Sequence, residues 1–246
     1  MFFINGQIPI SSLLGMAMLV TACSQTPKGF DNDPFESVNR KTHEFNKLID
    51  KNFIAPASAG YRSLVPDLVE NSLTNFAGNL SLPGKVVNNV LQLDLKSAGK
   101  NTARFVVNSS VGLLGIFDLA TSFGFYENNT DFGQTLHRWG LTEGAYIELP
   151  LFGASNFRDG VGQFVDMTLL DPSSYVLNEP ITTYRSVASV SALLQARQIY
   201  GDQIDAVLYE SADSYAQNRL IYFSPRRINS MCSTNNACDC YDYQIF

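Results

Sequence analysis

Along most of the chain, apolar residues recur every three or four positions, in short stretches that proline and glycine interrupt. This spacing is typical of amphipathic helices. We expect helices to begin near Asp33, Pro66 and Asp94, because aspartate caps helix N-termini and proline suits the first helical turn. We also expect two helices over residues 186–200 and 202–215, with breaks over 55–63, at Pro83–Gly84 and over 169–180.

The stretch over residues 131–166 follows neither the helical nor the strand period. Six glycines and Pro150 punctuate it, and it contains His137 and the only tryptophan, Trp139. Its aromatic residues distinguish it from a disordered linker. We therefore expect an ordered, glycine-hinged, irregular central segment packed on helices.

A second ambiguous stretch, residues 111–125, is apolar and carries a single charge, Asp118. It is too short to span a bilayer, which takes about 20 residues. The stretch fits either a helix lying in a membrane interface or the core of the protein, and periodicity does not choose between them.

The composition narrows the class of protein. The 246 residues include 17 Lys and Arg against 23 Asp and Glu, for a formal net charge of -6. This balance argues against a nucleic-acid partner, because phosphate binding needs clustered basic residues. Charged residues make up only 16% of the chain, against about 25% in a typical soluble domain. Low charge and 17 phenylalanines fit a protein that touches lipid, and a soluble protein with a large core would show similar numbers.

The N-terminus has the pattern of an export signal. Residues 1–22 carry no charged side chain, and the apolar run over residues 8–20 ends in Val20-Thr21-Ala22-Cys23, which resembles a bacterial lipobox. We expect a signal peptide over residues 1–22, acylation of Cys23, and a polar tether over 23–32. Acyl chains on Cys23 would anchor the protein, at about 0.8 kcal/mol per buried CH2. The alternative is an N-terminal core helix with an ordinary buried cysteine.

The chain offers little catalytic chemistry. It has no Gly-x-Ser-x-Gly, phosphate-binding loop, paired-acid motif or zinc-protease motif. His137, Asp131 and Ser155 can be drawn as a triad, but closeness in sequence is poor support for that geometry. We prefer to interpret His137 and Trp139 as an interfacial cluster. We expect no catalytic residue, no metal and no cofactor.

Residues 226–246 form a polar tail with three cysteines, Cys232, Cys238 and Cys240. In an oxidising compartment these allow one disulfide with one thiol left over, and a metal site lacks a fourth ligand nearby in sequence. We expect the protein to function without this tail.

Several short motifs occur in a specific order across residues 23–223. They are the lipobox at Cys23; Asp33-Pro34-Phe35-Glu36, Asn39-Arg40 and Phe45-Asn46; Asn75-Phe76, Asn79-Leu80, Pro83, Val87-Asn88 and Leu91-Gln92; Arg104-Phe105, Asn108, Gly115 and Asp118-Leu119-Ala120; Phe132-Gly133-Gln134-Thr135-Leu136, Trp139-Gly140, Gly144, Tyr146, Leu149-Pro150 and Gly153; and Arg158-Asp159, Gly162 and Asp166. With these motifs the sequence resembles the VacJ/MlaA family of outer-membrane phospholipid-transport lipoproteins.

The resemblance implies a mainly α, ring-like single domain over residues 33–225, embedded in the inner leaflet of the outer membrane. It implies an amphipathic channel that takes phospholipid from the outer leaflet to a soluble periplasmic carrier, and association with a trimeric porin. It implies no cofactor. The expected channel or lipid-contact residues are Leu113, Gly115, Phe117, Phe132, Trp139, Gly144 and Tyr146.

Two other functions compete with the conduit. One is a lipid hydrolase tethered by Cys23, which requires His137 to be catalytic. The other is a structural lipoprotein that braces the envelope or a porin and carries no lipid.

Overall fold

The computed structural model describes residues 33–170 and 181–235. The expected signal peptide, Cys23 and the tether lie outside the described residues, as do residues 171–180 and two of the tail cysteines. The described chain is mainly helical, which confirms the predicted class. Its elements in order are α2 (Glu36–Ile49), η2 (Asp50–Ile54), α3 (Ala55–Leu64), α4 (Asp67–Leu91), α5 (Leu95–Ser110), α6 (Leu119–Ser122), α7 (Phe132–Arg138), β1 (Tyr146–Leu149), β2 (Gly153–Asn156), α8 (Phe157–Thr168), α10 (Ile181–Ile199), α11 (Gly201–Asp205), η3 (Ala206–Glu210) and α12 (Ser214–Asn235).

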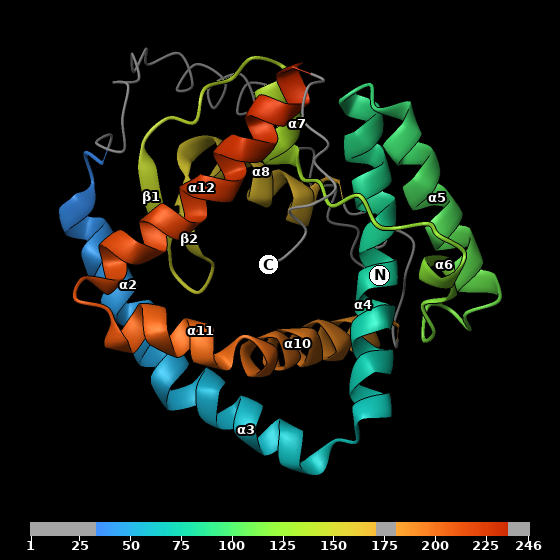
Figure 1. Ribbon diagram of the computed structural model, residues 1–246, viewed down its shortest axis with the longest axis horizontal. Helices are drawn as coiled ribbons and strands as arrows, with labels where there is room; N and C mark the ends of the chain where they lie inside the picture. The colour runs from blue at the N-terminus through green and yellow to red at the C-terminus, as the bar shows by residue number, and fades with distance from the viewer. Residues whose placement is uncertain (1–32, 171–180, 236–246) are drawn as a thin grey trace, which may run out of the picture.

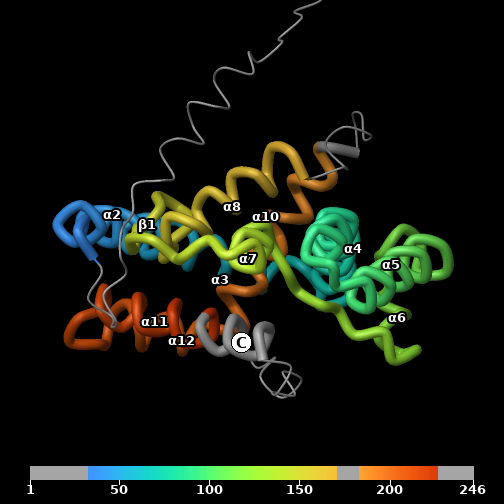
Figure 2. The backbone as a smooth tube through the Cα atoms, turned by 90° about the horizontal axis from the view of Figure 1, so that it is seen from above, coloured from blue at the N-terminus to red at the C-terminus, as the bar shows by residue number. Residues whose placement is uncertain are grey.

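These elements follow one another around a flat ring (Figure 1). The helices α2 and α3 form one side, and α4 with α5 forms the opposite side. The helix α10 joins the two sides, because it packs on both α3 and α4. Seen edge-on, α8 and α12 lie on opposite faces of the ring, and the β1–β2 hairpin contacts both of them (Figure 2).

The first helical stretch is longer than expected. Asp33 does not cap α2; its carboxylate accepts a hydrogen bond from Asn39 at 2.9 Å instead. The expected break over residues 55–63 is also wrong, because η2 and α3 continue the helix. The π-helical turn η2 shifts the hydrogen bonds by one residue, and Ala55 N donates to Asp50 O. Pro56 then falls in the first turn of α3, where proline is tolerated.

The helix α4 runs through Pro83–Gly84, where we expected a break. Packing against α5 and α10 outweighs the local preference. Gly84 serves another purpose: a Cβ atom there would lie 3.0 Å from the carbonyl oxygen of Leu170. The glycine therefore permits close approach of the segment that follows α8.

The central segment is ordered as expected but is not irregular. It contains α7, the antiparallel β1–β2 hairpin and α8, with Tyr146 opposite Asn156 and Leu149 opposite Gly153. Asp131 caps α7 and Asn156 caps α8, at 2.8 Å to the amides of Gln134 and Asp159. Elements this short do not establish a period in the sequence.

The expected division near Gly201 is confirmed, because α10 ends at Ile199 and α11 begins at Gly201. The second helix then ends earlier than expected, and α12 begins at Ser214. This helix continues through Pro225 to Asn235, so the expected start of the tail at residue 226 falls inside an element. Arg226 ties α12 to the ring, with Nη1 2.8 Å from Asp131 Oδ2 and Nε 3.4 Å from Asp159 Oδ2.

This placement changes the expectation for the tail. Ending the chain after Pro225 should lower the free energy of unfolding by about 1.5–3 kcal/mol, because hydrogen bonds to charged partners are lost and the mostly buried Asp159 loses a cation. Ending it after Asn235 keeps α12 whole and should change little. Urea unfolding of both truncations in detergent measures the difference, and equal stability of the two would contradict the assigned role of Arg226.

Polar residues dominate the interior and apolar residues the exterior. Among the described residues, 23 buried side chains are polar or charged and only eight are apolar, whereas 36 large apolar side chains are exposed. Asparagines illustrate the interior: Asn101 Nδ2 on α5 donates to Asn89 Oδ1 on α4 at 2.8 Å. No helix in the described part of the chain is long and apolar enough to cross a membrane.

Candidate functional site

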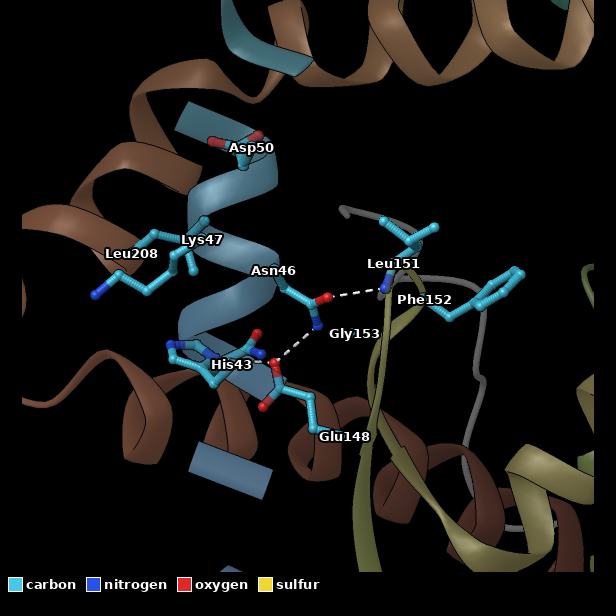
Figure 3. Close-up of a pocket in the computed structure, with 10 residues that line it drawn as sticks. His43, Asn46, Lys47, Asp50, Glu148, Leu151, Phe152, Gly153 and Leu208 are labelled. Carbon is cyan, nitrogen blue, oxygen red and sulfur yellow. Dashed lines mark hydrogen bonds and ion pairs between the residues drawn. The ribbon is translucent and has the colours of Figure 1, made fainter. Parts of the chain in front are cut away.

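Two adjoining cavities open where α2, the β1–β2 hairpin and the turn after η3 meet. Figure 3 shows the smaller of the two. Their volumes are 210 and 490 Å³. The smaller is lined by His43, Asn46, Lys47, Asp50, Glu148, Leu151, Phe152, Gly153, Leu208 and Asn218. The larger is lined by Arg40, Glu44, Lys47, Leu208, Tyr209, Ser211, Ala212, Asp213, Ser214 and Tyr215. Lys47 and Leu208 border both, so the two cavities form one site, which we call the hairpin site.

Helix α2 faces the hairpin with a polar stripe. Asn39, His43 and Asn46 are spaced four and three residues apart, so they share one helix face. Asn39 Nδ2 donates to the carbonyl of Tyr146 at 3.1 Å, and its Oδ1 accepts from the amide of Glu148 at 3.0 Å. These side chains satisfy the backbone groups of the outer edge of β1, which would otherwise lack partners.

Asn46 holds the tip of the hairpin. Its Nδ2 donates to the carbonyl of Leu149 at 3.1 Å. Its Oδ1 accepts from the amide of Leu151 at 2.8 Å (Figure 3). Leu151 has φ +67°, a left-handed conformation that leucine rarely adopts. Leu151 is 66% and Phe152 is 56% exposed. The two hydrogen bonds from Asn46 therefore hold the hairpin tip so that two apolar side chains lie beside the polar residues of the cavity.

A buried chain of hydrogen bonds runs through the polar side of the hairpin site. His43, 1% exposed, places Nδ1 2.9 Å from Glu148 Oε1 and Nε2 3.0 Å from Ser214 Oγ. Lys47 Nζ donates to the same hydroxyl at 3.2 Å. Because Lys47 donates to the hydroxyl and a carboxylate only accepts, the network is consistent with Nδ1 donating to Glu148 and Nε2 accepting from Ser214. It joins α2, β1 and α12.

Two ion pairs border the site. Arg197 on α10 binds Asp50 in bidentate geometry, at 2.8 and 3.0 Å. On the exposed rim, Arg40 binds Asp213 at 3.0 and 2.9 Å, and this hydrogen bonding lowers the pKa of Asp213 to about 2. The small stabilisation from the Asp213 pair is therefore present above pH 4 and is lost as the pH falls towards about 2.

The seven residues expected to contact lipid do not converge on the hairpin site. Leu113 and Phe117 are exposed in the loop after α5, with Leu113 at φ +53°. Gly115 has φ +93°, and a Cβ there would lie 2.7 Å from Asn79 Cγ, so the fold requires this glycine. Gly144 has φ +72° and lies against Phe157.

The aromatic members separate into two groups. Phe132 packs edge-to-face on Trp139 at 5.7 Å between ring centroids, and Trp139 Nε1 donates to the carbonyl of Leu91. Trp139 is half exposed. Tyr146 is fully buried against Tyr215 and Phe223 in the small aromatic core, so it is not placed to contact lipid. Its position on a short buried strand was not recognisable from the sequence.

The triad drawn from the sequence is not present. His137 Nδ1 lies 3.3 Å from Arg158 Nη1, Ser155 Oγ donates to the carbonyl of Asn156, and Asp131 caps α7. The histidine of the hairpin site is His43, to which we assigned no role from the sequence. The available signal was polar spacing: buried Asn39 and His43 alternate with exposed Val38 and Phe45 on the same helix. Among the described residues, no cluster of His, Cys, Asp or Glu is arranged to hold a metal.

A flat helical ring with a polar interior, an apolar exterior and one β-hairpin defines a class of protein suited to contact with lipid. The family model described as MlaA lipoprotein matches residues 31–229. The chain therefore belongs to the MlaA lipoprotein family.

Known relatives agree with this assignment. The intermembrane phospholipid transport system lipoprotein MlaA of Shigella flexneri is 32% identical, over 85% of this chain and 83% of the relative. An uncharacterised protein of Rickettsia bellii is 31% identical, over 84% and 80%. A solved structure, from work on the structural basis for maintenance of bacterial outer membrane lipid asymmetry, superimposes with a TM-score of 0.66 at 26% identity. That match covers 82% of this chain and 98% of the other.

Proposed function

We propose that this protein is an outer-membrane lipoprotein, anchored through Cys23, that maintains lipid asymmetry by intermembrane phospholipid transport. Phospholipid passes from the outer leaflet through the ring to a soluble periplasmic carrier, beside a trimeric porin. The MlaA name of the Shigella relative supports the transport role. The observation that carries the proposal is the inverted distribution of polar and apolar residues.

The apolar exterior supports embedding in lipid. Burying a large apolar side chain contributes about 1.5–3 kcal/mol, and 36 such side chains are exposed among the described residues. In water this surface would favour aggregation, whereas a lipid leaflet covers it. We propose that the ring lies within one leaflet, with its apolar exterior against the acyl chains.

The polar interior supports passage of a headgroup. A charged headgroup moving through an apolar medium loses its hydration, which is costly unless polar groups replace the water. The hairpin site offers amide, hydroxyl, ammonium and carboxylate groups next to apolar side chains. The sequence has no nucleotide-binding loop, so we propose a passive conduit whose driving energy is supplied elsewhere.

Reconstitution tests this function. We expect the acylated protein, purified in mild detergent, to carry phospholipid and to hand it to its periplasmic carrier without added nucleotide. Protein that carries no phospholipid at any stage would instead favour the structural lipoprotein.

The hydrolase remains a second candidate because Ser214, His43 and Glu148 have the contacts of a catalytic triad. In such a reaction, Ser214 Oγ attacks an ester carbonyl while Nε2 takes its proton and returns it to the leaving alcohol. Water then cleaves the acyl-enzyme. We prefer a structural role, because Ser214 is mostly buried and Lys47 already donates to its hydroxyl.

We therefore expect no labelling of the purified protein by a fluorophosphonate probe, which reacts with activated serines. The Ser214→Ala variant provides the matched control. Labelling that disappears in this variant would establish a nucleophilic serine and overturn the assignment of the protein as a pure conduit.

A further inference from the structure

We propose that the hairpin site is a phospholipid-docking subsite, in which Lys47 binds the phosphate and the Leu151–Phe152 tip contacts the acyl chains. This inference rests on the proposed function and assigns that function to particular residues. The occupant follows from the chemistry of the lining, which places a cation and two exposed apolar side chains around one pair of cavities.

Lys47 is positioned to receive a phosphate. Lys47 borders both cavities. Its ammonium group has three donors, of which one reaches Ser214 Oγ at 3.2 Å and another reaches Glu44 Oε1 at 3.4 Å. The Glu44 carboxylate is largely exposed, so its hold on the ammonium is weak. A phosphate oxygen can accept the remaining donor or replace Glu44.

The other cations around the site are bound more tightly to neighbouring carboxylates. Arg40 is bound by both Glu36 and Asp213, and Arg197 is bound by Asp50 and Asp205. Each forms charge-assisted bonds of 3.0 Å or less, shorter than either bond of Lys47. Lys47 is therefore the cation at this site that a phosphate recruits most readily.

The hairpin tip supplies the apolar contact. Glycine or asparagine would adopt the left-handed conformation of Leu151 more easily, and leucine there also exposes most of its side chain. Strain of this kind persists where the surroundings enforce it, and Asn46 provides that enforcement through two hydrogen bonds. In Figure 1 the tip points into the ring, where a lipid in transit would meet it.

The site separates its cation from its apolar side chains, as a phospholipid separates its phosphate from its acyl chains. In Figure 3 Lys47 extends from one side of α2, and Leu151 and Phe152 lie on the hairpin at the other side of that helix, although all three line the smaller cavity. Leu208 borders both cavities and adds an apolar contact between these sides. The cation and the apolar tip therefore lie at opposite ends of the site, as the phosphate and the acyl chains do in a phospholipid.

A photoreactive phospholipid with a diazirine in its acyl chain tests the site on the acylated full-length protein in detergent. We expect crosslinks at residues 151–152, and about a tenfold drop in their yield in the Leu151→Ser/Phe152→Ser variant, equivalent to about 1.4 kcal/mol of lost binding. Phe164→Ser/Met167→Ser is the matched control, because these residues are similarly exposed and belong to α8, not to the hairpin. It should leave the yield at the hairpin unchanged.

Lys47→Gln tests the phosphate contact, with exposed Lys51→Gln as its control. We expect only Lys47→Gln to reduce the amount of phospholipid that co-purifies. A photoreactive phenylalanine analogue at position 152 keeps an aromatic tip and should itself crosslink phospholipid.

Absence of crosslinks at the tip in both formats would overturn the subsite, as would equal lipid content in the Lys47 and Lys51 variants. If these variants restore lipid asymmetry in a deletion strain as well as the unaltered protein does, the subsite fails while the proposed function stands. If deletion itself leaves asymmetry unchanged, the proposed function fails.

Discussion

Replacing Asp50 by alanine should lower the free energy of unfolding by about 3–5 kcal/mol, because it leaves the buried Arg197 guanidinium without its main partner. The side chains of Asp50 and Arg197 are 10% and 8% exposed. Their bidentate pair joins the π-helical turn η2 to α10, and Tyr209 adds a hydrogen bond to Asp50 at 2.8 Å. Loss of the pair therefore weakens the contact between η2 and α10.

Hydrogen bonding to Asp50 raises the pKa of Arg197 above its ordinary value. An arginine keeps its charge without its partner, so the variant leaves a buried cation. Urea unfolding in detergent provides the measurement. Asp202→Ala, an exposed acid on the neighbouring helix α11, is the control and should change stability by less than about 0.5 kcal/mol. An Asp50→Ala protein as stable as this control would show that the pair contributes little.

Gly162→Ala should destabilise the protein by about 3 kcal/mol, the upper part of the usual range for overpacking. A Cβ atom at Gly162 would lie 2.7 Å from the Cα atom of Gly133 on α7. The Cβ is fixed to the backbone of α8 and the atoms it would meet belong to the backbone of α7, so relief requires α7 and α8 to separate. A change of side-chain rotamer cannot relieve the clash.

Gly78→Ala in α4 is the matched control, because a Cβ there meets no atom within 4 Å. We expect this variant to gain roughly 0.5–1 kcal/mol from the higher helix propensity of alanine. Opposite signs for the two glycines in thermal or urea unfolding are the predicted result. A neutral Gly162→Ala variant would contradict the close packing of α7 on α8.

Local capping chemistry was predictable from the sequence. Asp94 was expected to begin a helix, and its side chain accepts from the amide of Ser97 at 3.0 Å at the start of α5. Pro66 immediately precedes α4 for a similarly local reason. Such signals depend on a few neighbouring residues, so one sequence is enough to reveal them.

Tertiary packing explains most of the errors. Pro56 and Pro83 lie in continuous helices because a π-helical turn and packing on two neighbours compensate for them. The hairpin was missed because its strands have four residues each. Arg226 was assigned to a tail because its partners, Asp131 and Asp159, lie far away in sequence.

The hairpin site was missed because this protein reverses the usual arrangement of apolar residues inside and polar residues outside. Apolar Phe45 and Leu48 on α2 are exposed, while His43 on the same helix is buried. A prediction that places apolar helix faces in the interior turns the wrong face of α2 inwards if the surroundings are lipid. The polar spacing of Asn39, His43 and Asn46 carried the information.

The amount of phospholipid in the outer leaflet of the outer membrane tests the central claim most directly. It should be measured in a strain that lacks this gene and in the same strain complemented with the unaltered protein. We predict that outer-leaflet phospholipid rises on deletion, that the barrier to detergent weakens, and that complementation reverses both. Unchanged leaflet composition on deletion would contradict the conduit.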